Sequence, residues 1–418
     1  MLVYTFHHSK VALMQRLSSS LRRRSAEETL KIIVNDVAPR LGITRVTDTT
    51  WLDCIGIPVF ASIRPDALKG ALCVNAGKGL RATEAKIGAY MEAIEFSLAQ
   101  YNTAQLKLLR TTPRQIIGSH EGRIKFSQFC MLYGFSADAD SLIMAIEAED
   151  ILRRQKVLVP AELVFIPYPE NPGQQLFGES SSGLASGNEL VEASVHAVCE
   201  LMERDIQAFN HMYDRSRLVN LDSCSAEAKA LVNKISGSGL SLAVRHTENC
   251  FGLACFQAFI MEESSQAPIS VATGSGLHPI KEIALIRAIC EAAQSRLSHI
   301  HGGRDDIIER VKYFERKGRS VELQAISSLR TAATSRNQMI DYSSIECQEA
   351  AIPTIESAWE LLIERLQRVG LSTVLRVLLS KASDDITVVR VIIPGLETFE
   401  PGLKRVGPRL STYVKQSA

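Results

Sequence analysis

Apolar positions recur with a helical period in several parts of this chain, and the first clear case follows residue 25. Ser25 and Glu28 have the spacing of a capping box, in which their side chains accept hydrogen bonds from backbone N–H groups at the start of a helix. Apolar residues then lie on one helical face: Leu30, Ile33, Val34, Val37 and Leu41. Gly42 should end this helix, because glycine readily takes the left-handed conformation that follows a last helical turn.

The same kind of pattern predicts further helices over residues 83–100, 187–205, 279–299 and 355–369. Short apolar runs predict strands over residues 57–60, 71–74, 142–145, 157–160, 242–244, 254–261, 372–379 and 386–393. Residues 75–80 are typical of a glycine turn that carries Lys78, and the charged segment 303–350 is typical of a mobile excursion or lid. Because strands and helices are interleaved without a repeat or linker, we predict an α/β (mixed α+β) domain over residues 41–418, after an N-terminal helical segment over residues 1–40.

Composition narrows the class of protein without indicating a charged partner. The 418 residues are 46% apolar, which is ordinary for a soluble globular protein. The net charge of +1 gives no argument for nucleic acid or an anionic membrane, and no apolar run reaches the roughly 18 residues of a membrane-spanning helix. The nine cysteines include no CxxC pair, which predicts reduced thiols in a cytoplasmic protein. Residues 1–26 contain no acid, and we expect a basic helix there rather than a transit peptide.

The predicted helix over 187–205 carries an unusual polar face. Four side chains fall within about 80° of one another around the helix axis: Glu192, His196, Glu200 and Glu203. The positions between them are apolar, so this face should point into the protein. Two like charges about 6 Å apart repel by roughly 2.8 kcal/mol at an effective dielectric of about 20. A fold that gathers these carboxylates must therefore supply cations, protons or metal ions.

Two other predicted helices enlarge this set of charged residues. The helix over 83–100 carries three glutamates on one face, and the helix over 279–299 spaces Arg287, Glu291 and Gln294 at i, i+4 and i+7. Seven glutamates then stand against three bases: Glu84, Glu92, Glu95, Glu192, Glu200, Glu203 and Glu291, with Lys78, Arg204 and Arg287. Hard oxygen ligands in this number suit Mg²⁺ that bridges to phosphate, and Lys and Arg suit phosphate oxygens. Buried salt bridges alone would leave several acids unpaired.

Other kinds of site fit the sequence less well. Gly77-Lys78-Gly79 is not a P-loop, because Gly79 stands where GxxxxGK[ST] requires a hydroxyl residue. His196 and Glu200 lie one turn apart, as zinc ligands can, but the chain has no HExxH motif. No Cys and His stand out as a nucleophile and its base, so the catalytic residues stay unassigned.

The charged residues also resemble the signature blocks of the YcaO family. The resemblance covers residues 40–400 and lies in four blocks in the family's order: Gly77-Lys78-Gly79 with Glu92-Ala93-Ile94-Glu95; Gly187-Asn188 with Glu192 and Glu200-Leu201-Met202-Glu203-Arg204-Asp205; Arg287 to Arg296 with Arg304-Asp305-Asp306; and Val389 to Glu397.

The resemblance implies an ATP-dependent enzyme that modifies peptide backbone amides, with a YcaO-type fold in which ATP lies over helices carrying Mg²⁺-ligating carboxylates. In that family a nucleophile adds to the amide carbonyl, ATP phosphorylates the oxygen, and phosphate leaves. A Cys, Ser or Thr side chain of the substrate gives an azoline, and an external sulfide equivalent gives a thioamide. The match implies nucleotide contacts at Lys78, Asn188, Arg204, Arg287 and Gln294. It implies metal ligands at Glu92, Glu95, Glu192, Glu200, Glu203 and Glu291.

Departures from the azoline-forming members favour thioamide formation. Residues 404–410 contain one proline where many such members have a PxPxP tail, and no separate leader-peptide domain is evident. The layout of residues 27–30 and 42–46 looks more like the members that work with a TfuA-type partner and are associated with thioamides. The family resemblance also implies a peptide or protein substrate and a homodimer. The alternatives are an azoline-forming cyclodehydratase, a non-catalytic ATP-binding accessory subunit, and a metal hydrolase that does not use ATP.

Overall fold

The chain begins with a small hairpin and a short helical stretch. The computed structural model describes residues 14–101, 106–168, 175–263, 270–336 and 338–417. Strands β1 (Gln15–Arg16) and β2 (Leu21–Arg22) pair, and α1 (Ala26–Ile32), a π turn (Ile33–Val37) and α2 (Ala38–Arg40) follow. The predicted capping box of Ser25 and Glu28 is confirmed. The basic helix expected over 1–26 is wrong for residues 15–22, which form the β1–β2 hairpin, while residues 1–13 lie outside the described part. The domain boundary at residue 40 stays a prediction.

A three-stranded antiparallel sheet packs against the first long helix. Its strands are β3 (Arg45–Asp48), β4 (Val59–Ile63) and β5 (Val74–Lys78), and α3 (Ala82–Leu98) packs against β4 and β5. Gly77 permits the close approach of strand and helix, because a Cβ there would lie 2.0 Å from the backbone nitrogen of Ala89. The predicted glycine turn is therefore wrong at residues 75–78: β5 continues through Lys78, and Gly77 serves helix packing instead of a turn.

A six-stranded sheet has the order β10-β17-β16-β8-β6, with β9 also paired to β8. The strands are β6 (Leu109–Thr111), β8 (Ile143–Asp150), β9 (Gln155–Pro160), β10 (Leu184–Gly187), β16 (Leu375–Leu378) and β17 (Thr387–Ile392). Helix α4 (Pro113–Ser119) packs beside β9, and α5 (Leu190–Met212) packs against β10 and β17. Helix α10 (Ile355–Arg368) lies on α5, and strands β7 (Met131–Leu132) and β18 (Arg405–Val406) pair ahead of α11 (Pro408–Ser417).

A five-stranded sheet carries the other long helix of the core. Its order is β14-β13-β12-β11-β15, formed by β11 (Arg217–Asn220), β12 (Ser241–His246), β13 (Ala254–Met261), β14 (Val271–His278) and β15 (Met339–Asp341). Helix α7 (Lys281–His301) lies on β13 and β14, and α6 (Ala226–Gly237) lies beside it. Gly274 and Gly276 of β14 allow this contact, because a Cβ at either position would lie 2.2 Å from backbone atoms of α7.

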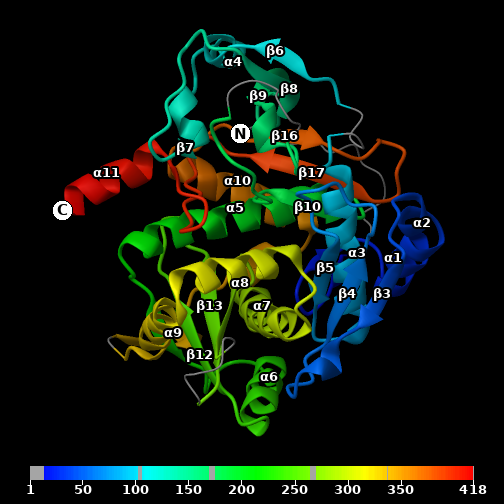
Figure 1. The fold of residues 1–418 in the computed structure, drawn as a ribbon, viewed down its shortest axis with the longest axis vertical. Helices are drawn as coiled ribbons and strands as arrows, with labels where there is room; N and C mark the ends of the chain where they lie inside the picture. Colours follow the sequence, from blue (N-terminus) through cyan, green and yellow to red (C-terminus); the bar gives the residue numbers. More distant parts are fainter. Residues whose placement is uncertain (1–13, 102–105, 169–174, 264–269, 337, 418) are drawn as a thin grey trace.

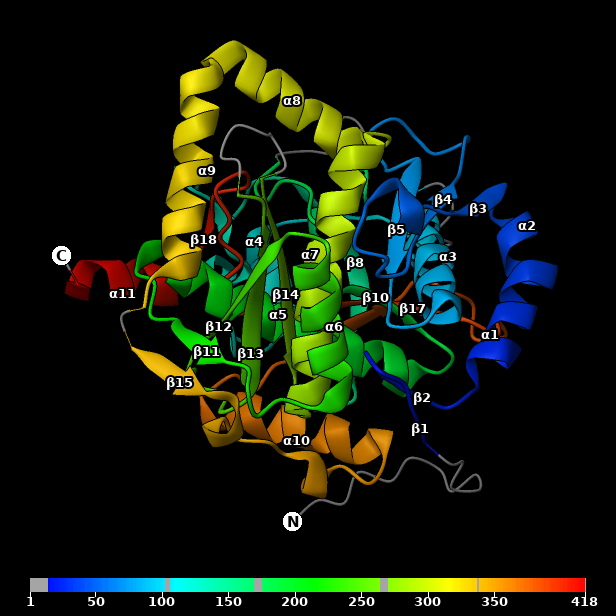
Figure 2. The same cartoon turned by 90° about the horizontal axis from the view of Figure 1, so that it is seen from below.

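Residues 303–350 differ from their prediction. They form α8 (Asp305–Lys317) and α9 (Arg319–Thr334), two consecutive helices that run in different directions in Figure 2, followed by β15 in the five-stranded sheet. Ala333 of α9 is fully buried against Ala243 and Phe259 of that sheet. The expectation of an excursion is therefore wrong for α9, which packs on this sheet, and for β15, which completes it. A role of the segment as a lid stays a prediction.

Helix α5 lies between the two larger sheets (Figure 1). It contacts β10 and β17 on one side and β14 on the other, while α3 contacts β10 and α7 contacts β5. Helices α3, α5 and α7 are therefore brought together at the junction of all three sheets. The mixed α/β architecture confirms the predicted fold class. Of the helices in the described ranges, none combines the length and the hydrophobicity that a bilayer crossing needs.

Candidate functional site

A cavity of about 450 Å³ opens where α3, α5 and α7 meet, and it gathers most of the residues singled out in the sequence. Strand β5, the N-terminal hairpin and the start of α8 complete its walls. Nine of the eleven predicted site residues line it: Lys78, Glu92, Glu95, Glu200, Glu203, Arg204, Arg287, Glu291 and Gln294. Glu84 and His196, which the helical spacing also placed on these faces, line it as well.

Lys78 and Glu291 form an ion pair in the lining of the cavity. The Lys78 Nζ lies 2.6 Å from Glu291 Oε2, with both side chains about a quarter exposed. Burial alone would raise the pKa of Glu291, but Lys78, and then Arg204 and Arg287, bring that pKa below its ordinary value. Glu291 is therefore ionised, and Lys78 is held in the cavity by β5 at the point where Gly77 lets α3 approach.

A serine on β14 connects two carboxylates from different helices. The Ser275 hydroxyl lies 2.5 Å from Glu203 Oε1 on α5 and 3.4 Å from Glu291 Oε1 on α7. Burial and the nearby Glu291 raise the pKa of Glu203. The Gly274-Ser275-Gly276 sequence thus has two roles, because its glycines admit α7 and its serine donates to the acidic cluster.

Glu95 and Glu200 form the second acidic corner, beside β10. Glu95 Oε1 accepts a hydrogen bond from the Ser186 hydroxyl at 2.6 Å, and Glu200 Oε2 accepts one from the Gly183 N–H at 3.3 Å. Burial, followed by the charges of Glu92 and Glu200, raises the pKa of Glu95 to about 8. Burial also raises the pKa of Glu200. Burial therefore disfavours the ionised form of both carboxylates, and a bound cation would favour it.

The cations of the cavity keep donor capacity. Arg204 lies 3.7 Å from Glu200, and its buried Nε has no hydrogen-bond partner among the described residues. Burial opposes its charge, yet Glu200, Glu203 and Glu291 raise the pKa of Arg204 above its ordinary value. Among the described residues, Arg287 donates a single long hydrogen bond, 3.4 Å, to the carbonyl of Ser19. These guanidinium groups are suited to bind a polyanionic ligand.

Asn188 and Glu192 lie beside the cavity but outside its lining. Glu192 is 2% exposed and accepts hydrogen bonds from the backbone N–H groups of Asn188, at 2.8 Å, and Arg23, at 2.5 Å. The Thr29 hydroxyl donates to Asn188 Oδ1 at 2.9 Å. In this structure both residues attach the N-terminal segment to the start of α5, and their predicted ligand contacts stay a prediction.

The donor set fits Mg²⁺. Every acidic group in the lining of the cavity is a carboxylate, the hard oxygen ligand that Mg²⁺ prefers, and burial together with the charges of Glu92 and Glu200 raises the pKa of Glu95. In the described part of the chain no three His, Cys, Asp or Glu side chains converge closely enough to hold an ion alone. Mg²⁺ ordinarily keeps waters and bridges to substrate phosphates instead of filling an all-protein cage.

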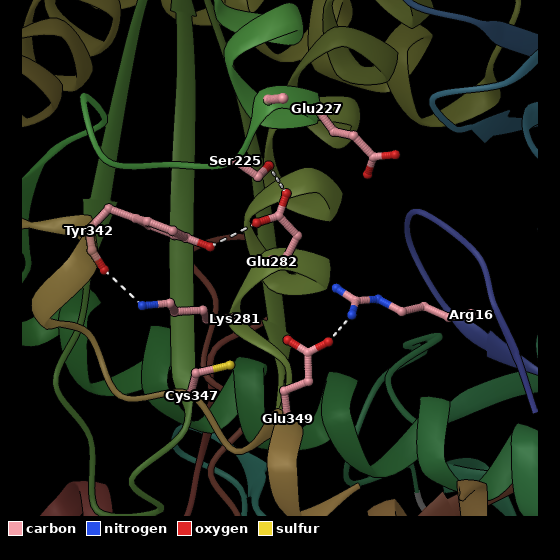
Figure 3. A pocket seen from close by; sticks show the side chains of 9 residues that line it. Arg16, Ser225, Glu227, Lys281, Glu282, Tyr342, Cys347 and Glu349 are labelled. Atoms are coloured by element: carbon pink, nitrogen blue, oxygen red, sulfur yellow. Dashed lines mark hydrogen bonds and ion pairs between the residues drawn. The ribbon is translucent and has the colours of Figure 1, made fainter. Parts of the chain in front are cut away.

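A second hollow, of about 370 Å³, lies at the N-terminal ends of α6 and α7 (Figure 3). Its polar groups are engaged with each other: Lys281 Nζ donates to the carbonyls of Tyr342, at 3.1 Å, and Ile345, at 2.9 Å. The Glu282 carboxylate accepts hydrogen bonds from the hydroxyls of Ser225 and Tyr342. These contacts fasten the segment after β15 to α7, so this hollow serves the fold.

Comparison with known proteins agrees with the geometry. Residues 76–397 match the family model described as YcaO cyclodehydratase, ATP- and Mg²⁺-binding. The chain belongs to the YcaO family. An uncharacterised protein of Methanothermobacter thermautotrophicus is 32% identical over 93% of this chain and 98% of its own length. An uncharacterised protein encoded in the tfuA 3′ region of Rhizobium leguminosarum is 31% identical over 85% of this chain and 84% of its own length.

Among solved structures, YcaO from Methanopyrus kandleri, bound with AMPPCP and Mg²⁺, superposes with a TM-score of 0.71. The two chains are 20% identical, and the match covers 93% of this chain and 96% of the other, so it shows a shared YcaO fold. The family description confirms the expectation of ATP and Mg²⁺ as the ligands of this family.

Sequence reasoning missed several residues of the YcaO cavity. Arg22, Ser19 and Ser20 enter from the N-terminal hairpin. Arg304 and Asp306, which lie in the third signature block but had no predicted role in the site, enter from the start of α8. The sequence signal that could have identified Arg22 is the run of three arginines at residues 22–24, because the predicted site lacked positive charge.

His196 is in the lining, but burial, and then Arg287 and Arg22, hold its pKa well below the ordinary value. It is therefore a neutral imidazole.

Proposed function

We propose that this YcaO protein uses ATP and Mg²⁺ to activate a backbone amide of a ribosomal peptide or protein, and that it installs a thioamide with a TfuA-like sulfur-delivery partner. The observation that carries the proposal is the cavity in which carboxylates of α3, α5 and α7 surround Lys78, Arg204 and Arg287. The relative encoded in a tfuA 3′ region supports the choice of partner. A homodimer in the cytoplasm belongs to the same proposal.

In this proposal the cations bind nucleotide phosphates and the carboxylates hold Mg²⁺. Lys78, Arg204 and Arg287 contact phosphate oxygens, and Asn188 and Gln294 contact the nucleotide. Glu92, Glu95, Glu192, Glu200, Glu203 and Glu291 are metal ligands, directly or through water. When bound, Mg²⁺ supplies positive charge that stabilises the transferring phosphoryl group.

The proposed reaction replaces the amide oxygen by sulfur. A sulfide equivalent adds to the carbonyl carbon, the C=O π electrons move to oxygen, and that oxygen takes the γ-phosphoryl group as ADP leaves. Loss of a proton from sulfur and departure of inorganic phosphate with its C–O electron pair then give the C=S bond. Phosphorylation is required because an unmodified amide oxygen is a poor leaving group.

Azoline formation is the second candidate, favoured by the description of the matching family as a cyclodehydratase. The same cavity would serve it, because the amide oxygen is phosphorylated in both reactions and only the nucleophile differs. A third possibility, an ATP-binding accessory subunit, would bind nucleotide without modifying a peptide.

The first test is calorimetric titration of the purified protein with ATP, in MgCl₂ and then in EDTA. Mg²⁺-dependent binding that Glu203→Gln abolishes supports the site, and absence of binding in both buffers contradicts it. Incubation with Mg²⁺-ATP, sulfide and protein extract from cells that lack this chain then separates the reactions. Exchange of oxygen for sulfur indicates a thioamide, loss of one water indicates an azoline, and no change of mass supports an accessory role.

A further inference from the structure

Arg390 of β17 is a buried cation that the site described above does not use. Its side chain is 1% exposed, and no carboxylate of the described chain lies within ion-pair distance of its guanidinium. Burial lowers the pKa of Arg390 to about 10, although the negative charge of Glu200 opposes that shift. An isolated charge is costly to bury, so this arginine requires a specific explanation.

The guanidinium donates to two backbone carbonyls of one loop. Nη1 lies 3.1 Å from the Ser182 oxygen and Nη2 lies 2.5 Å from the Ser180 oxygen, so the two contacts flank Ser181. The planar fork of arginine can reach two acceptors at once, whereas a lysine ammonium is a compact point charge. The residue type at position 390 therefore matches the task of fixing this loop.

The same loop touches the acidic corner of the cavity. Ser181 lines the cavity, and the Gly183 N–H donates to Glu200 Oε2 at 3.3 Å. Gly183 has φ of 81°, and a Cβ there would lie 2.3 Å from the Val391 carbonyl, next to Arg390. Val391 N–H in turn donates to the Gly183 carbonyl at 2.8 Å. The loop is thus fastened to β17 on one side and to Glu200 on the other.

We propose that Arg390 is a positioning residue for the metal-binding corner of the site: it fixes the loop 180–183 so that the Gly183 N–H orients the Glu200 carboxylate toward the cavity. The effect on metal binding rests on the proposed function, while the effect on the loop does not.

The chain offers a matched control for this arginine. Arg405 is 7% exposed and also donates to two loop carbonyls, those of Cys130 at 2.8 Å and Phe129 at 2.7 Å. Burial lowers the pKa of Arg405 too. Its loop, however, does not line the cavity. Arg405→Lys therefore measures the effect on the fold of weakening a buried arginine that lies away from the cavity.

The experiment compares Arg390→Lys with Arg405→Lys in two measurements. The first is amide hydrogen exchange of residues 180–184 in metal-free protein, followed by mass spectrometry. The second is the MgCl₂ concentration needed for half-maximal binding of ATP in calorimetry. We expect Arg390→Lys to speed exchange in the loop and to raise that concentration about tenfold, the order found when a residue supporting a metal ligand is lost. Arg405→Lys should leave both unchanged.

Unchanged loop exchange in Arg390→Lys, or equal shifts in both variants, would overturn the proposal. Faster exchange with unaltered Mg²⁺ dependence would also overturn it, since the loop would then not govern Glu200. If Arg390→Lys does not fold, Arg390→Met provides the same test without a buried charge. If the wild type binds no Mg²⁺-ATP, the proposed function fails, and the exchange measurement still decides whether Arg390 fixes the loop.

Discussion

Neutralising Glu95 should stabilise the metal-free protein, although this residue belongs to the proposed metal site. Its pKa is raised to about 8 by burial and by the charges of Glu92 and Glu200. Glu95→Gln removes the charge but keeps Oε1 as an acceptor for the Ser186 hydroxyl, which lies 2.6 Å away. The variant therefore removes electrostatic repulsion with little change in packing.

The size of the effect follows from proton linkage. Between the ordinary carboxyl value of 4.5 and about 8, the folded chain binds the Glu95 proton more tightly than the unfolded chain. The free energy of unfolding therefore falls as pH rises through this window, by on the order of 4 kcal/mol at pH 8. Water in the open cavity screens part of this electrostatic cost. We therefore expect Glu95→Gln to raise the free energy of unfolding at pH 8 by about 2 kcal/mol. For 418 residues that is a rise in Tm of roughly 2 °C.

The assay is thermal unfolding in EDTA at pH 5 and pH 8. Glu95→Gln should raise Tm at pH 8 and have little effect at pH 5, where Glu95 is protonated in the folded wild type. Glu360→Gln, the same substitution at an exposed position of α10, is the control and should change neither value. A lower Tm for Glu95→Gln at pH 8, or an equal gain in the control, would refute the electrostatic reasoning.

Three further outcomes are expected. Glu203→Gln should keep the fold and abolish ATP-dependent turnover, since it removes a proposed metal ligand; wild-type turnover at saturating Mg²⁺ would contradict this. Gly77→Ala should lower the free energy of unfolding in urea by about 1–3 kcal/mol or more, because its Cβ would lie 2.0 Å from the Ala89 nitrogen. Gly118→Ala, with open space around the added Cβ, should not lower it. Arg409→Met should destabilise by about 3–5 kcal/mol in the same assay, because Asp205, 1% exposed and 2.5 Å away, loses its ion-pair partner and keeps the hydrogen bond from the Glu397 N–H; a wild-type midpoint would argue against this.

The helices were predictable where local signals and apolar spacing agree. The capping box at Ser25 and the stripes of α3, α5, α7 and α10 all gave helices close to those observed. The predictions of secondary structure failed where tertiary contacts, and not local sequence, determine the conformation. Gly77 lies in β5, where the absence of a side chain lets α3 pack against the strand. No local sequence pattern reveals this contact. The two-residue strands β1 and β2 are likewise too short to give a periodic signal.

The candidate site was predictable where its residues lie together on one face of a helix. Residues spaced by three or four positions on α3, α5 and α7 point into one cavity, and they make up most of the nine predicted residues that line it; Lys78 comes from β5. Asn188 and Glu192 lie at the start of α5, where the N-terminal segment reaches them instead. Arg22 and Arg304 come from the N-terminal hairpin and from the start of α8, and only the folded chain brings them to this cavity.

These two arginines change the charge balance on which the sequence argument depended. The cavity is lined by seven acids and by five bases, where the sequence suggested three: Glu84, Glu92, Glu95, Glu200, Glu203, Glu291 and Asp306, against Arg22, Lys78, Arg204, Arg287 and Arg304. Acids still exceed bases in this lining, and burial together with the charges of Glu92 and Glu200 raises the pKa of Glu95. A polyphosphate entering this cavity would add negative charge to a site that already lacks cations. Nucleotide and metal must therefore bind together, because each supplies the charge that the other needs.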